Sequence, residues 1–193
     1  MKILQIKSSI LDNNSTSNKY SSKLIDSIKH PNDEIIVRDV SLNPVTPLSG
    51  SVLGELGNPN SAVTKEHNYL IEEIKSADIV VIGAPMYNFS IPSTLKNYFD
   101  AITKAGITFK YNEQGQPVGF LSNKKTYVII SRGGKYKEQG ITFQEDYLKM
   151  QLGFIGLTDV KFIFVEGLAM GLSPEIIQEN FNQQLELLNN ITK

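Results

Sequence analysis

Short runs of β-branched and other apolar residues alternate along the chain with segments whose apolar residues recur every three or four positions. The first pattern predicts β-strands and the second predicts amphipathic helices. The runs that predict strands are residues 3–6, 34–38, 79–83, 126–131 and 160–165. The third and fourth runs are almost continuously apolar, which is typical of parallel strands that are buried on both faces.

Five segments with helical periodicity complete the alternation. In the first helix Tyr20, Leu24, Ile25 and Ile28 share one face, and the next two helices are expected over residues 64–75 and 93–104. Ser173 and Pro174 predict the start of the last helix, with serine as N-cap and proline at the first helical position. For the two remaining apolar faces we expect Phe143, Tyr147, Leu148 and Met150 over residues 143–154, and Ile177, Phe181, Leu185, Leu188 and Ile191 in the last helix.

Alternating strands and helices favour an α/β fold with a parallel sheet between two helical layers. Right-handed crossovers leave few topologies, and five strands best fit the flavodoxin-like three-layer sandwich with strand order 2-1-3-4-5. We expect residues 1–193 to form a single domain. Two long connections interrupt the pattern, over residues 39–63 and 106–123, and the second reads as a hairpin with Gln114 and Gly115 near its tip. Loops of this length are usually functional or form subunit contacts.

Composition narrows the function classes. The 193 residues carry 19 basic and 20 acidic side chains, for a net charge of −1, so we expect neither nucleic acid nor a membrane surface as a partner. The absence of cysteine excludes disulfides, thiolate metal sites and thiol nucleophiles, and the two histidines have no metal-ligand spacing, so no metal is expected. The first residues do not have the pattern of a signal peptide, which favours a cytoplasmic protein.

Ligands of open parallel sheets bind beyond the carboxyl ends of the strands. The loop after the first strand has no glycine-rich nucleotide motif but carries hydroxyl groups at the start of the first helix, on Ser9, Ser15, Thr16 and Ser17. Unpaired N–H groups and the helix dipole make this a suitable place for one phosphate group. The alternative is that Ser15 or Ser17 is simply an N-cap.

Two further loops meet the first at this edge. The loop after the third strand offers apolar faces and an amide, typical of a site for a planar heteroaromatic ring, in Met86, Tyr87, Asn88 and Phe89. The loop after the fourth strand contains paired glycines, which allow close backbone approach to a ligand, in Ser131, Arg132, Gly133 and Gly134. The alternatives are a hydrophobic loop packed under a helix and a flexible turn.

These loops, read with the segments around them, closely resemble the FMN-dependent NADH-azoreductases, also described as NADH:quinone oxidoreductases. The resemblance runs nearly end to end, through residues 7–11, 84–89, 95–100, 105–109, 131–134, 152–156 and 165–167.

The resemblance implies a homodimer with one FMN per subunit and NADH as electron donor. It implies that Ser9, Ser15, Thr16 and Ser17 hold the FMN phosphate, and that residues 86–89 and 131–134 frame the isoalloxazine. Thr16 stands where a relative has glutamine, and Tyr136 where some relatives have histidine, which bears on substrate preference. Tyr111 and Phe154 resemble family aromatics near the acceptor pocket, although both residue types are equally suited to core packing.

The expected activity follows from this resemblance. The flavin would carry the chemistry, with no catalytic side chain, in a ping-pong cycle. Quinones would be reduced by two electrons to hydroquinones, which protects against electrophilic quinones, and aromatic azo compounds would be cleaved to amines. Two other classes share the fold, a one-electron flavodoxin carrier and a flavin-free scaffold domain. The near-neutral charge argues against the carrier, and the three ligand-suited loops argue against the scaffold.

Overall fold

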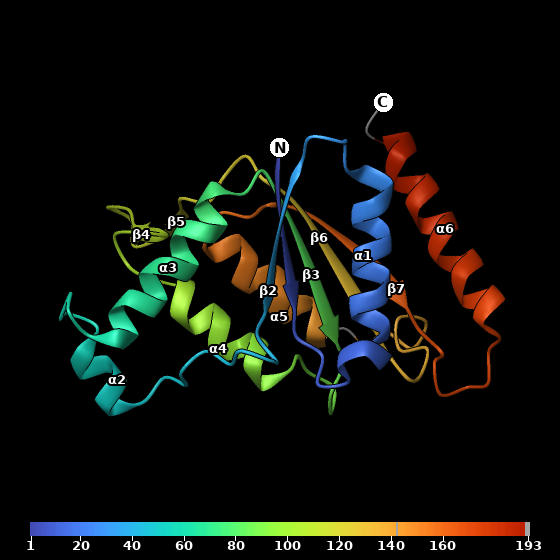
Figure 1. Ribbon diagram of the computed structural model, residues 1–193, viewed down its shortest axis with the longest axis horizontal. Helices are drawn as coiled ribbons and strands as arrows, with labels where there is room; N and C mark the ends of the chain where they lie inside the picture. The colour runs from blue at the N-terminus through green and yellow to red at the C-terminus, as the bar shows by residue number, and fades with distance from the viewer. Residues whose placement is uncertain (142, 192–193) are drawn as a thin grey trace.

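The computed structural model, which describes residues 1–141 and 143–191, has one five-stranded parallel sheet at its centre (Figure 1). The strand order β2-β1-β3-β6-β7 is the predicted order 2-1-3-4-5, because two short hairpin strands intervene in the numbering. The strands are β1 (Lys2–Lys7), β2 (Glu34–Asp39), β3 (Ile79–Pro85), β6 (Lys125–Ser131) and β7 (Asp159–Val165). All seven residues of the central strand β3 are buried, as its apolar run predicts.

Helices cover both faces of the sheet. Figure 1 shows α1 (Thr16–Ile28) and α6 (Pro174–Ile191) on one face, and α3 (Ala62–Ser76), α4 (Ser93–Ile102) and α5 (Phe143–Phe154) on the other. Ser173 precedes α6 as predicted, and its Oγ accepts a hydrogen bond from the N–H of Ile176 at 3.4 Å. Ile191, predicted to extend the apolar face of α6, lies outside the described side chains. Within the described residues no helix is long and apolar enough to cross a membrane.

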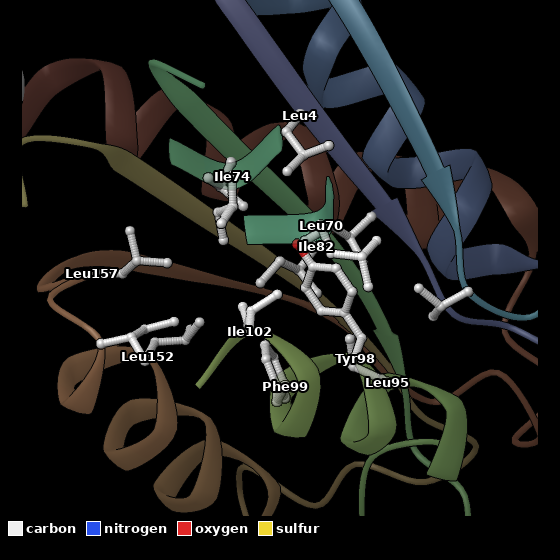
Figure 2. Packing of buried hydrophobic residues seen from close by; sticks show 14 of the residues in the cluster. Leu4, Leu70, Ile74, Ile82, Leu95, Tyr98, Phe99, Ile102, Leu152 and Leu157 are labelled. Atoms are coloured by element: carbon white, nitrogen blue, oxygen red, sulfur yellow. The ribbon is translucent and has the colours of Figure 1, made fainter. Parts of the chain in front are cut away.

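Two hydrophobic clusters hold the layers together. The larger lies between the sheet and α3, α4 and α5, and its members Leu70, Ile82, Tyr98 and Phe99 meet in Figure 2. The smaller joins α1 and α6 to the sheet, where the rings of Tyr20 and Phe181 lie 4.7 Å apart. Burying each large apolar side chain contributes ~1.5–3 kcal/mol to stability, so both clusters favour this layered arrangement.

The predicted apolar face of α5 is partly wrong. Phe143 and Met150 are 72% and 76% exposed, whereas Gln144 and Glu145 are buried, at 1% and 5% exposure. The physical reason is that a buried arginine, Arg132, lies against this helix and donates hydrogen bonds to the side-chain oxygens of both polar residues. Helical periodicity predicts that a helix has two different faces. In α5 the contact with Arg132 determines which face turns toward the sheet.

The two long connections differ in their structure. Residues 39–63 contain a short helix, α2 (Gly50–Glu55), which the sequence did not predict; Val45 and Val52 are buried, while Leu48 and Leu53 remain exposed. Residues 106–123 form the predicted hairpin of β4 (Phe109–Tyr111) and β5 (Pro117–Gly119), with Gly115 at a positive φ of 73°.

The hairpin docks on the end of α5 through glycine. A Cβ atom at Gly119 would lie 2.0 Å from the backbone nitrogen of Gly156, so the two backbones can approach this closely only without side chains. The N–H of Leu121 completes the contact by donating to the carbonyl of Ile155 at 2.9 Å.

His67 in α3 gives the fold a pH dependence. Its side chain is buried and its Nε2 has no hydrogen-bond partner among the described residues. Burial lowers the pKa of His67 below its usual 6.5, because the imidazolium would lose its hydration. As the pH falls below 6.5, the unfolded chain takes up a proton that the folded chain does not, so we expect the free energy of unfolding to fall. Urea unfolding between pH 7.5 and 5 measures this; His67→Leu should flatten the profile, and an unchanged slope would contradict the assignment.

Candidate functional site

Three loops meet at the carboxyl end of the sheet and enclose a cleft of about 130 Å³. They are the β1–α1, β3–α4 and β6–α5 loops, with a contribution from the segment after β7. The cleft is lined by Ser9, Leu11, Thr16, Pro85, Met86, Tyr87, Ser131, Arg132, Gly133 and Leu168. Residues from all three sequence-predicted loops therefore lie together in one place.

The start of α1 presents unpaired backbone donors to this end of the sheet. Ser15 is the N-cap, since its Oγ accepts from the N–H of Asn18 at 3.1 Å, whereas Ser17 lies inside the helix. The hydroxyl groups of Ser15 and Ser17 are 3.2 Å apart, and both side chains are buried. Within the described chain the N–H groups of Thr16 and Ser17 have no partner. Free N–H groups at the positive end of a helix dipole favour an anion.

Tyr87 ties the first loop to the second. Its hydroxyl lies 3.2 Å from the Oγ of Ser9 and accepts from the N–H of Ile10 at 3.1 Å. Beneath this contact the hydroxyl of Ser8 donates to the carbonyl of Gly83 at 2.7 Å. The serine loop and the aromatic loop are thus held as one unit.

The second loop is a tight turn rather than a segment packed under a helix. The N–H of Tyr87 donates to the carbonyl of Ser90 at 2.9 Å, and the two residues between them, Asn88 and Phe89, have φ angles of 48° and 68°. Positive φ is tolerated by asparagine but is unusual for a bulky aromatic residue, and such strain costs about 1–3 kcal/mol. Phe89 is nevertheless 54% exposed, so the turn projects this ring outward.

The third loop exposes backbone donors at its glycines. The carbonyls of Gly133 and Gly134 accept from the N–H groups of Ala169 and Gly167 at 3.0 and 3.2 Å, while their own N–H groups have no partner in the part of the chain described. The side chain of Arg132 is buried and ion-paired, so it lies outside the open part of the cleft. The ring of Tyr136 meets that of Phe89 edge to face, with centroids 6.0 Å apart, so the second and third loops also contact each other through these two rings.

Two sequence-predicted aromatics lie elsewhere in the subunit. Tyr111 on the hairpin and Phe154 at the end of α5 have ring centroids 6.3 Å apart, in a cluster with Phe109. Because α5 begins beside the cleft and returns the chain to the start of β7, this aromatic cluster lies at the opposite end of the sheet.

Comparison with known proteins agrees with this arrangement. A family model described as a flavodoxin-like fold matches residues 1–188. The FMN-dependent NADH:quinone oxidoreductase of Yersinia enterocolitica is 41% identical over 98% of both chains, and that of Shigella flexneri is 46% identical over 91% of this chain and 90% of its own. This chain belongs to the family of FMN-dependent NADH:quinone oxidoreductases, which has a flavodoxin-like fold. An FMN-dependent NADH-azoreductase from Bacillus anthracis, solved in complex with FMN, superposes with a TM-score of 0.83 at 28% identity, covering 100% of this chain and 99% of that one.

In this flavodoxin-like oxidoreductase, several residues of the site were missed by sequence reasoning. Asn18 is 8% exposed and its Oδ1 has no hydrogen-bond partner among the described residues, directly beside the serine loop. Leu168 lines the cleft from the segment after β7. Gln144 and Glu166 lie beneath the loops, where they bind Arg132 and backbone groups of the second and third loops. No local pattern singles out Gln144 or Glu166, because each acts through partners that are remote in sequence.

Proposed function

We propose that this protein is an FMN-dependent NADH:quinone oxidoreductase that also cleaves aromatic azo compounds. The observation that carries the proposal is one cleft where unpaired N–H groups at the start of α1, which suit an anion, meet the Met86–Phe89 turn and the unpaired N–H groups of the glycine loop. The named activities of the relatives, at 41% and 46% identity over nearly the whole chain, support the same assignment.

The residues present fit FMN in two parts. The buried hydroxyls and free N–H groups at the start of α1 suit the phosphate, and we assign to it Ser9, Ser15, Thr16 and Ser17. The turn and the glycine loop suit the isoalloxazine, and we assign to it Met86, Tyr87, Asn88, Phe89, Ser131, Arg132, Gly133 and Gly134. Because Arg132 is buried, its part is to support the loop rather than to contact the ring.

When bound, FMN supplies the capacity to accept a hydride from NADH and to pass two electrons to a quinone. The chain supplies binding, orientation and exclusion of water. The free N–H groups of Gly133 and Gly134 stabilise negative charge that develops in the cleft. Phe89 and Tyr136, whose rings are in contact, would offer an aromatic surface against which a planar acceptor can stack.

The test is direct. The purified protein should be yellow, should release FMN rather than FAD on denaturation, and should lose its visible absorbance with NADH and regain it with a quinone. Stoichiometric FAD, or no flavin after reconstitution, would overturn the assignment.

Initial rates should identify a ping-pong order. Because the three loops surround a single cleft, NADH and the quinone would occupy the same place one after the other. We expect parallel double-reciprocal lines against NADH at several fixed quinone concentrations. Intersecting lines would require a ternary complex and would contradict a shared binding place.

A homodimer accounts for the apolar surface of α5. Phe143, Tyr147, Met150 and Phe154 follow helical spacing along one side, and the first and third of these are strongly exposed. A twofold axis through this stripe packs the two α5 helices antiparallel, so that the Phe154 end of one copy lies at the Phe143 end of the other. The cluster of Tyr111 and Phe154 would then reach the cleft of the second copy, as expected for acceptor-pocket residues.

Light scattering tests this interface. We expect a mass of about twice 21.5 kDa at micromolar concentration, and a monomer for Met150→Lys, because the dimer would bury the added charge. Leu187→Lys is the matched control, since Leu187 is 63% exposed on α6, which packs on the other face of the sheet. A monomeric wild-type protein with full activity would contradict the proposal.

We further propose that the whole chain acts as a single flavin-binding domain in the cytoplasm, where NADH is available as reductant. Two-electron reduction bypasses one-electron products, so a role in protection against electrophilic quinones follows from the proposed chemistry.

A further inference from the structure

Beneath the cleft, a buried polar network joins the ends of three strands. Arg132, which follows β6, is 1% exposed, and its guanidinium donates to side chains from two other elements. Its Nε donates to Oε1 of Gln144 at 3.2 Å and its Nη1 to Oε1 of Glu166 at 3.1 Å, while its Nη2 pairs with Glu145. Arginine has only donors, so the oxygen of the Gln144 amide must face it.

The amide nitrogen of Gln144 therefore points the other way, toward β3. It donates to the carbonyls of Ala84 and Pro85 at 3.0 and 3.3 Å. These are the last two residues before the Met86–Phe89 turn. One side chain thus links the root of that turn to the arginine at the root of the glycine loop.

Glu166 fixes the other end of the glycine loop. A single oxygen, Oε1, accepts from Arg132 and from the N–H groups of Tyr136 and Lys137, the latter two at 3.0 and 3.1 Å. Both ends of the segment from Arg132 to Lys137 are therefore attached to one carboxylate, and Gly133 and Gly134 lie between the attachments.

We infer that Gln144 and Glu166 are positioning residues that set the spacing between the Met86–Phe89 turn and the Arg132–Lys137 loop across the cleft. The inference rests on the proposed function, because it assigns those two segments to the isoalloxazine. Neither side chain lines the cleft, so both act through the backbone that they hold. Among the interactions described for it, the serine loop contacts the turn through the Tyr87 hydroxyl and has no hydrogen bond to Arg132, Gln144 or Glu166.

Gln144→Glu is the discriminating variant. It keeps the length of the side chain and an oxygen for Arg132, but it removes the N–H donors and places a carboxylate oxygen against the carbonyls of Ala84 and Pro85. The matched control is Gln151→Glu on the same helix, where the native amide donates to the Thr103 hydroxyl at 2.8 Å, away from both loops.

Hydrogen exchange of the apoprotein is the first readout. Removing donors from buried carbonyls should speed exchange about tenfold or more at the hydrogen-bonded N–H groups of both segments, which are Met86 and Tyr87 in the turn and Tyr136 and Lys137 in the glycine loop. The N–H groups of Asn18 and Lys19 in α1 should be unchanged. The second readout is flavin affinity from fluorescence titration. We expect the Kd of FMN and that of riboflavin to rise by the same factor, roughly tenfold to a hundredfold, because the network supports the ring and not the phosphate.

Wild-type exchange and affinity in Gln144→Glu, or faster exchange in only one of the two segments, would overturn the inference. If this variant does not fold, Glu166→Gln and Glu166→Ala replace it: glutamine keeps an acceptor for both N–H groups and should retain most of the affinity, whereas alanine should not. Equal affinity in these two variants would also overturn it. A wild-type protein that binds no flavin would refute the proposed function instead, and the exchange measurement would still test the network.

Discussion

Ser15→Asp should abolish FMN retention while leaving the apoprotein folded. An aspartate at this position would place a carboxylate beside the N–H groups that we assign to the phosphate. Two like charges about 4 Å apart repel by about 4 kcal/mol at an effective dielectric constant of 20, which corresponds to roughly a thousandfold rise in the Kd of FMN. Equilibrium dialysis and the flavin-to-protein ratio after gel filtration measure the loss.

The fold should tolerate the same change. Aspartate is as good an N-cap as serine, and a negative charge is favourable at a helix N-terminus. Beside Ser15 lies a second cleft of about 180 Å³, lined by Lys7 and Lys19, which gives the larger side chain room. Ser15→Asn is the matched control, because it caps without charge and should keep most of the FMN affinity. Wild-type FMN binding in Ser15→Asp would show that the phosphate site lies elsewhere.

Arg132→Ala should destabilise the apoprotein by about 3–5 kcal/mol, because it leaves buried charges without their partner. Arg132 pairs with both Glu145 and Glu166, whose side chains are 6% and 12% exposed. The carbonyl-bound Gln144 would also lose the group that its oxygen faces. Urea unfolding at pH 7.5 gives the free energy directly.

A second arginine, Arg38, provides the comparison for the loss of stability expected in Arg132→Ala. Arg38 pairs with Glu73 at 2.6 Å but is 20% exposed, so water can replace part of the interaction and Arg38→Ala should cost less. Arg132→Lys keeps the charge without the planar fork and should fall between alanine and the wild type. A loss below about 1 kcal/mol in Arg132→Ala would mean that the two carboxylates are not held by this arginine.

The pattern of the sequence was enough to predict the layered fold and the edge of the sheet at which the three loops form a cleft. Five apolar runs predicted five strands in the observed order, and Gly115 predicted the hairpin turn. These features depend on local periodicity, on right-handed crossovers and on a conformation that glycine adopts without strain. The three loops then had to meet, since the carboxyl ends of parallel strands share one edge.

Only the tertiary structure decided which of several equivalent residues takes each role. Ser15 and Ser17 are the same residue type two positions apart, and the path of the chain into α1 makes the first of them the cap. Phe89 takes a positive φ that its own preferences oppose, because the turn between Tyr87 and Ser90 requires it.

The orientation of α5 shows most clearly the difference between what local sequence determines and what tertiary contacts determine. Its apolar residues predicted an inward face, yet Gln144 and Glu145 turn inward to meet Arg132, and Phe143 and Met150 are left exposed. A buried charge must be paired, and that requirement outweighs the burial of two apolar side chains. Local sequence determined that residues 143–154 form a helix, while contacts with an arginine twelve and thirteen residues away determined how that helix faces the core.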